Sequence, residues 1–183
     1  AKTYLNLGVA YSDVGRVNEA RQTLEIARQL HTELLSRHPQ EVELRVDLAH
    51  VHGALASVAS SDRQYAEAEA ALRVALALYQ QLAAELPDAK EFQFYVAKTH
   101  NNLGAVCNRD KRYQDGLDAF TAAQRSLQPL EQEFQRRPDF QQEQLTCDIG
   151  LGTCYRHLSG RDKDAAAAYR YTECRMSQIA GAL

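Results

Sequence analysis

The spacing of apolar residues along the chain predicts helices. Apolar residues recur three and four positions apart, as in the two stretches Leu24, Ala27, Leu30, Leu34 and Leu72, Ala75, Leu78, Leu82. This spacing places the apolar residues on one face of a helix, whereas a half-buried strand would alternate apolar and polar residues. No strand-like run competes with the pattern, so the sequence predicts an all-α fold.

The helical pattern returns at a fixed interval. A leucine followed by a small residue occurs four times at equal spacing, at Leu7-Gly8, Leu55-Ala56, Leu103-Gly104 and Leu151-Gly152. This period of about 48 residues is typical of solenoids and other repeat arrays. We therefore expect one solenoid domain over residues 1–183, built from units 1–39, 40–87, 88–138 and 139–183. Because the chain begins inside a helical pattern, we also expect it to be part of a longer protein.

Helix breakers divide each unit into two helices of about 22 residues. A turn is predicted in the middle of each unit, at Gly15-Arg16, Ser60 to Arg63, Asp110 to Arg112 and Ser159-Gly160. A proline is expected to close each of the first three units, at Pro39, Pro87 and Pro138. The fourth unit keeps the register if one residue is inserted between Tyr155 and Gly160. The predicted architecture is an α-α superhelix of about four antiparallel helix pairs.

Composition favours protein partners over nucleic acid or membrane. The formal net charge is -3, and charged residues make up 25% of the chain. A nucleic-acid-binding domain would be expected to be basic. The apolar stretches fall far short of the roughly 18 residues needed to cross a bilayer. We expect no cofactor, no nucleic acid and no membrane span.

The segment from Tyr4 to Ala27 resembles the tetratricopeptide repeat, which pairs aromatic, Leu-Gly and Ala positions with a closing proline. The positions that match are Tyr4, Leu7, Gly8, Tyr11, Ala20, Leu24, Ala27 and Pro39. The usual repeat has about 34 residues, so the longer period of this chain implies that both helices are lengthened. This length, with Gly15 to Ala20 and Asn101 to Gly104, resembles the extended repeats of kinesin light chains and of regions attached to bacterial serine/threonine kinases.

The resemblance implies that the first helix of each unit lines a concave groove that holds a peptide. Helical spacing then nominates groove residues, namely Lys2, Asn6, His50, Lys98, Asn101, Asn102, Arg109 and Arg156. Asparagine amides can donate to and accept from a peptide backbone, while Lys and Arg favour carboxylates. Asp47 and Glu143 fall on a similar face and would offset two of the cations. We hypothesise an acidic or mixed peptide bound around the third unit.

Two functional interpretations stay open. One is a protein-interaction scaffold that uses the groove. The other is a regulatory or self-association module, appended to an upstream enzyme such as a serine/threonine kinase. It would act through the convex face, formed by the second helices, or through its terminal helices. Lys98 and Arg109 can also be read as ordinary solvated residues with no ligand.

Histidines and cysteines show no catalytic or metal-binding pattern. His52 and His100 are equivalent in the repeat and occupy a packing position, while His31, His38 and His157 are expected at the surface. The four cysteines lack C-x-x-C spacing, and most fall on apolar stripes, as expected for buried small side chains. We therefore predict no metal site and no enzymatic activity, and we infer a reducing compartment, the cytoplasm.

Overall fold

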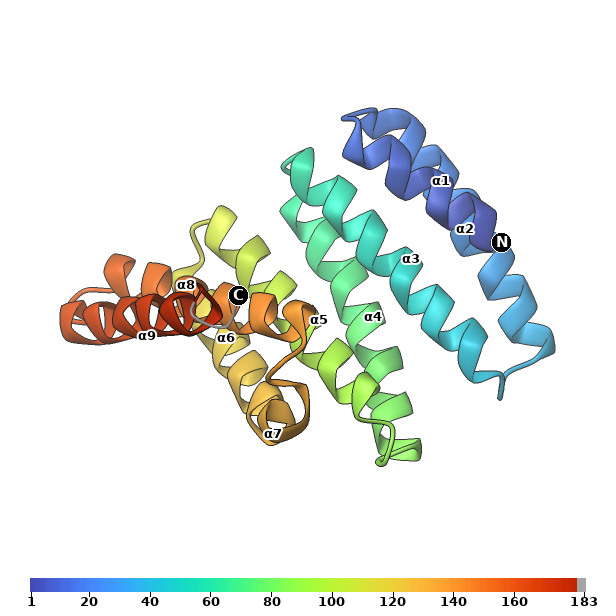
Figure 1. Ribbon diagram of the computed structural model, residues 1–183. Coiled ribbons are helices and arrows are strands. Elements are labelled where there is room, and N and C mark those ends of the chain that lie inside the picture. The colour runs from blue at the N-terminus through green and yellow to red at the C-terminus, as the bar shows by residue number, and fades with distance from the viewer. Residues whose placement is uncertain (181–183) are drawn as a thin grey trace. The chain divides into compact units, whose positions relative to one another are not determined.

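The computed structural model describes residues 1–180, with side chains up to Ser177, and in this range it contains helices and turns but no strand (Figure 1). Its contacts divide the chain into two compact units, Ala1–Pro87 and Asp88–Leu183. The N-terminal unit contains α1 (Lys2–Asp13), α2 (Val17–Arg37), α3 (Val42–Ser61) and α4 (Tyr65–Glu85). The C-terminal unit contains α5 (Lys90–Arg109), α6 (Tyr113–Leu127), the 3-10 helix η1 (Gln128–Leu130), α7 (Glu131–Phe134), α8 (Pro138–His157) and α9 (Asp162–Ala180). The prediction of an all-α helical repeat is confirmed.

Each unit consists of two helix pairs. We call α1, α3, α5 and α8 the first helices, and α2, α4, α6 and α9 the second helices. Each first helix packs against the second helix that follows it, and α3 and α8 also pack against the second helix that precedes them. Within each unit the two first helices are in contact, α1 with α3 and α5 with α8.

The repeat register is visible in the helix boundaries. The first helices end at Asp13, Ser61, Arg109 and His157, which are equally spaced along the chain. The turn that follows contains one residue with a left-handed backbone in each case, at Gly15, Arg63, Lys111 and Gly160. The fourth turn is one residue longer, from Leu158 to Arg161, so the predicted insertion before Gly160 is confirmed.

Two details of the predicted helices are wrong. The second helix of the third repeat does not run unbroken, because α6 ends at Leu127 and Pro129 lies in the 3-10 turn that follows. Proline lacks the N–H that a continuous helix requires. Pro138, expected to close this repeat, is instead the first residue of α8. Proline suits that position because the first helical N–H groups have no partner within the helix.

Close helix packing depends on the small residue after each repeat leucine. A Cβ atom added to Gly8 would lie 2.6 Å from Cγ of Leu24, and one added to Gly104 would lie 2.7 Å from the Phe120 ring. These side chains sit at the centre of the two cores. The N-terminal core joins α2 to α3 through Ala20, Leu24, Ala27, Val51, Leu55 and Val58. The C-terminal core surrounds Phe120 and includes Phe94, Phe134, Phe140 and Leu151.

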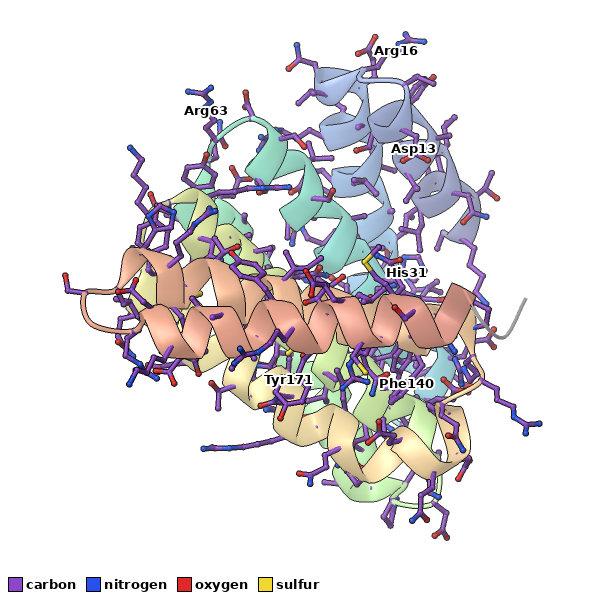
Figure 2. All side chains as sticks on the ribbon, turned by 60° about the vertical axis from the view of Figure 1, so that its left-hand side comes forward. Asp13, Arg16, His31, Arg63, Phe140 and Tyr171 are labelled. Atoms are coloured by element: carbon purple, nitrogen blue, oxygen red, sulfur yellow. The ribbon has the colours of Figure 1, made fainter. Side chains whose placement is uncertain are left out.

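His31 was expected at the surface, and this prediction is wrong. Its side chain is 0% exposed, and Figure 2 marks its position on α2. The ring atom Nδ1 lies 2.8 Å from the carbonyl oxygen of Ala27, so this nitrogen carries the proton and donates it. Nε2 lies 3.5 Å from Oδ2 of Asp47 on α3. The ring therefore fills the space between α2 and α3. His38 and His157 are exposed, as predicted.

Candidate peptide-binding face

The predicted groove residues of the N-terminal unit are exposed on one pair of first helices. Lys2 and Asn6 lie on α1 and His50 lies on α3. The Lys2 ammonium donates to Glu43 and lies 3.6 Å from Oδ2 of Asp47. The hydrogen bond to Glu43 raises the pKa of Lys2 above its usual value. Lys2 is therefore a cation held between two carboxylates of the neighbouring helix.

The C-terminal unit repeats this arrangement at the equivalent positions two repeats later. Lys98, Asn102 and Arg109 are exposed on α5, and Arg156 is exposed on α8. Nζ of Lys98 lies 3.8 Å from Oε1 of Glu143 on α8. Lys98 and Glu143 are the repeat equivalents of Lys2 and Asp47, so both units place one Lys-carboxylate pair between adjacent first helices. The predicted offset of the cations by Asp47 and Glu143 is borne out by these two pairs.

Asn101 does not face a ligand, contrary to the sequence prediction. Its side chain is 0% exposed, and its Nδ2 atom donates to the backbone oxygen and to Oε2 of Glu143, both at 2.9 Å. Burial raises the pKa of Glu143, although Asn101 and Lys98 both oppose the shift. Asn101 therefore joins α5 to α8. The signal that could have shown this is its register, because Leu5 and Gly53 occupy the same repeat position.

We call the exposed surface of the first helices in each unit the first-helix face. It carries both signs of charge, and it also exposes aliphatic side chains: Val9 on α1 is 38% exposed and Ile149 on α8 is 48% exposed. Amides at equivalent points, Asn6 and Asn102, complete it. This mixture can hydrogen-bond a peptide backbone and contact apolar side chains at the same time.

A second surface lies over the second helices, where the sequence analysis nominated no individual residues. The N-terminal unit has a pocket of about 260 Å³ between α2, α3 and α4, lined by Arg28, His52 and Val74 among others. The C-terminal unit has a pocket of about 410 Å³ whose lining includes their repeat equivalents Gln124, Asp148 and Tyr171. We call this surface the second-helix face. The sequence offers one indication of this surface, namely an apolar residue at the same repeat position of three second helices. These residues are Ile26, Val74 and Tyr171, which are 43%, 42% and 66% exposed; Figure 2 labels Tyr171.

The two pockets differ at one equivalent lining position, which is His52 in the N-terminal unit and Asp148 in the C-terminal unit. In the N-terminal unit His52 is half-buried, and burial lowers its pKa, which favours a neutral ring. In the C-terminal unit Asp148 is buried and accepts a hydrogen bond of 2.7 Å from Nε of Arg175. Nη1 of Arg175 also lies 3.6 Å from Oε1 of Glu131. Burial raises the pKa of Asp148, and Arg175 opposes the shift.

Three cysteines are buried as predicted, at Cys107, Cys147 and Cys154, while Cys174 is exposed. Burial raises the pKa of Cys147 to about 12 and that of Cys154 to about 11. Such thiols are protonated at neutral pH and weakly nucleophilic. In the part of the chain that the structure describes, no three His, Cys, Asp or Glu side chains are placed to share a metal ion. Among the described helices, none has the length and apolar character needed to cross a membrane.

Comparisons with known proteins agree with this geometry. Residues 1–40 match the family model described as "Tetratricopeptide repeat". No curated protein matches the sequence. Among solved structures, the chain is similar to that of BtubC (BKLC) from P. vanneervenii, with a TM-score of 0.75 and 22% sequence identity. The match covers 97% of this chain and 63% of the BtubC chain. At this identity the likeness is one of fold.

The helix pairs and their register define an all-α helical-repeat protein of the solenoid class. The match over residues 1–40 identifies the repeat in this segment more closely: it is similar to the tetratricopeptide repeat. Repeats of this kind generally mediate protein-protein interaction and are typically scaffolds without catalytic activity. The resemblance to the extended repeats of kinesin light chains and kinase-attached regions stays a prediction.

Proposed function

We propose that this chain is a protein-interaction module that holds an extended polypeptide segment along the first-helix face. The observation that carries the proposal is the pair Asn6 and Asn102. They are repeat equivalents, both are exposed, and neither has a hydrogen-bond partner within the described residues. An unengaged amide can donate to a carbonyl and accept from an N–H of an extended chain. Each unit therefore offers one such amide to a backbone that lies along its own first helices.

The charges of the face favour a ligand of mixed charge. Each unit sets a lysine beside a carboxylate, Lys2 with Asp47 and Lys98 with Glu143. In each unit, the carboxylate would repel a purely acidic peptide, and the lysine would repel a purely basic one. Each lysine is exposed but already lies beside a largely buried carboxylate, so these charges should add little to the affinity for a peptide. Affinity should therefore come from backbone hydrogen bonds and from apolar contact with Val9 and Ile149.

Fluorescence polarisation with labelled peptides tests this proposal. The probes are three extended peptides of equal length: one acidic, one basic, and one that combines Lys, Glu, Ser and Leu. We expect the mixed peptide to bind most tightly. Asn6→Ala and Asn102→Ala should each weaken it by about 1 kcal/mol, roughly a fivefold rise in Kd. The matched control is Asn18→Ala, an exposed asparagine on α2. Equal binding of all three peptides, or no effect of the two variants, would remove the proposal.

The second-helix face is the alternative binding surface, because its two pockets occupy equivalent positions in both units. The larger has the size of a typical small-ligand or side-chain pocket. Removal of the exposed ring in Tyr171→Ala separates the two surfaces. If the mixed peptide loses affinity in this variant and keeps it in Asn6→Ala and Asn102→Ala, the second-helix face is the binding surface.

We also propose a cytoplasmic setting. Cys107, Cys147 and Cys154 are buried thiols outside any disulfide, and the cytoplasm keeps thiols reduced. Mass spectrometry of the protein isolated from its natural source, with free thiols blocked during lysis, tests this. Disulfide-bonded cysteines in that sample would contradict the proposal.

A further inference from the structure

The pocket of the N-terminal unit contains a polar ring that forms no hydrogen bond within the chain. This pocket of about 260 Å³ lies between α2, α3 and α4, three helices of the same compact unit. We call it the His52 pocket, because the half-buried imidazole of His52 on α3 is part of its lining. Among the described residues, none forms a hydrogen bond with either ring nitrogen of His52.

The equivalent position of the C-terminal unit has its partner within the chain. There Asp148 accepts a hydrogen bond of 2.7 Å from Nε of Arg175 on α9. The repeat equivalent of Arg175 on α4 is Leu78, which is half-buried and whose side chain has no donor. His52 therefore lacks the internal contact that Asp148 has, and its ring nitrogens can bind a group from outside the chain.

The lining on both sides of His52 is apolar. Leu55 lies one turn further along α3, and Ala70, Ala71 and Val74 line the pocket from α4. The two alanines are small, and Val74 is 42% exposed, so these side chains leave an apolar surface beside the imidazole. A cavity of about 150 Å³ is enough to hold a benzene ring. The His52 pocket therefore has the size and the walls to receive an aromatic ring.

The charged groups of the lining already have partners. Glu25 accepts a hydrogen bond of 2.8 Å from Arg28, and Glu67 accepts one of 2.7 Å from Arg21. Burial lowers the pKa of His52, so its ring is neutral and offers one donor and one acceptor. The pocket thus favours an uncharged group that combines an aromatic ring with a hydroxyl.

We propose that the His52 pocket receives a tyrosine side chain of a partner polypeptide. The ring lies against Leu55, Ala71 and Val74, and its hydroxyl donates to the acceptor nitrogen of His52. Burial of the ring supplies most of the affinity, and the hydrogen bond selects tyrosine over phenylalanine. Exposed residues such as Ala70 border the pocket, so a main chain can cross its mouth. This site is separate from the first-helix face.

Side-chain analogues test the chemistry in NMR titrations of the whole chain. The probes are p-cresol, which is the tyrosine side chain without a backbone, and toluene, which is that of phenylalanine. Both should shift the signals of Val74 and His52, and p-cresol should bind about fivefold more tightly because of its hydroxyl. His52→Phe keeps a ring and removes the acceptor, so the two affinities should become equal. His38→Phe, the same change at an exposed histidine of α2, should keep the difference.

A short peptide tests whether the ring comes from a polypeptide. The peptide acetyl-Gly-Ser-Tyr-Ser-Gly-amide should shift the same signals and bind at least as tightly as p-cresol, and its phenylalanine counterpart should bind about fivefold more weakly. Val74→Glu places a charge on the wall of the pocket and should weaken the binding of both peptides. Because this side chain is exposed, the fold should be retained, which circular dichroism checks.

The outcomes that overturn the proposal are distinct. If no probe shifts the signals of Val74 and His52, the pocket is not a binding site. Equal affinities of the wild type for p-cresol and toluene contradict the hydrogen bond to His52. Binding of p-cresol without binding of the tyrosine peptide contradicts a polypeptide partner. Because p-cresol has no backbone for Asn6 and Asn102 to bind, this proposal and the proposed function fail independently.

Discussion

Arg63 adopts the same left-handed backbone conformation as Gly15, its equivalent in the preceding repeat, with φ of 59° at Arg63 and 75° at Gly15. Lys111 continues the series at 62°. The hydrogen bonds of the turn are also repeated, since the N–H of Arg16 donates to Tyr11 and that of Gln64 donates to Ala59. The turn geometry is thus a property of the repeat, and the side chain at this position adapts to it.

Replacing Arg63 by glycine should stabilise the protein. A residue with a Cβ atom pays about 1–2 kcal/mol in the left-handed region, whereas glycine does not. Glycine also makes the unfolded chain more flexible, and this offsets part of the gain in stability. We expect Arg63→Gly to raise the free energy of unfolding by about 0.5–1 kcal/mol, measured by urea denaturation. Arg63→Ala is the control, because it removes the side chain and keeps the strain. A gain in the alanine variant equal to that in the glycine variant would refute the explanation.

The helical glycines should respond to alanine in opposite directions. A Cβ added to Gly53 meets nothing within 4 Å, whereas one added to Gly150 would lie 2.2 Å from the Phe120 ring. Gly53→Ala should stabilise α3 by about 0.5–1 kcal/mol through helix propensity. Gly150→Ala should cost about 1–3 kcal/mol through overpacking. Thermal unfolding monitored by circular dichroism would reveal the split, and the same sign for both variants would contradict the packing described for Phe120.

His31 should behave as a core residue. His31→Ala leaves a cavity between α2 and α3, for which we expect a loss on the order of 2–3 kcal/mol. His38→Ala, at the exposed end of the same helix, should stay within about 0.5 kcal/mol of the wild type. Chemical denaturation of the two variants compares them directly. Equal effects would mean that His31 is not packed as the structure shows.

The Glu143 carboxyl should make stability depend on pH with a definite sign. Its pKa is raised above the usual 4.5 by burial. The folded state then binds a proton more readily than the unfolded state, so the contribution of Glu143 is present below about 4.5 and is lost as the pH rises through the folded value. Glu143→Gln keeps an acceptor for Asn101 and cannot ionise. It should therefore gain stability over the wild type at pH 7, and the gain should shrink on acidification toward 4.5.

Asp139 provides the control of opposite sign. Its hydrogen bond from Arg137 holds its pKa below the usual value. Asp139→Asn should therefore lose stability at neutral pH, and the loss should shrink as the pH falls through the usual Asp value of 3.8. Both series can be followed by urea denaturation at several pH values. A Glu143→Gln gain that is independent of pH would contradict the assigned shift.

The sequence predicts the helices and turns well because the repeat register carries them. Leu55 and Leu151 are buried, as their place in the register implies, and the left-handed turn recurs even where glycine is absent. The break at Pro129 was missed because periodicity continues through it: Leu127 and Leu130 still point into the core on either side. A proline at this spacing changes the helix and leaves the apolar stripe intact.

The binding face is harder to predict, because burial depends on the neighbouring helix. Asn101 and Asn102 are adjacent in sequence, yet Asn101 is 0% exposed and Asn102 is exposed. The difference lies in Glu143 on α8, which accepts from Asn101 and comes 42 residues later. His31 is a similar case, since its neighbour Asp47 lies on another helix. One helical pattern alone cannot tell a residue that faces solvent from one that faces a partner helix.

The most direct test of the central claim, that the first-helix face binds a polypeptide, is a titration of isotopically labelled protein with the mixed Lys, Glu, Ser and Leu peptide, followed by NMR. We expect the side-chain amide signals of Asn6 and Asn102 to shift with increasing peptide, while the backbone amides of Val74 and Tyr171 stay unchanged. Shifts that gather at Val74 and Tyr171, with Asn6 and Asn102 unchanged, would contradict it.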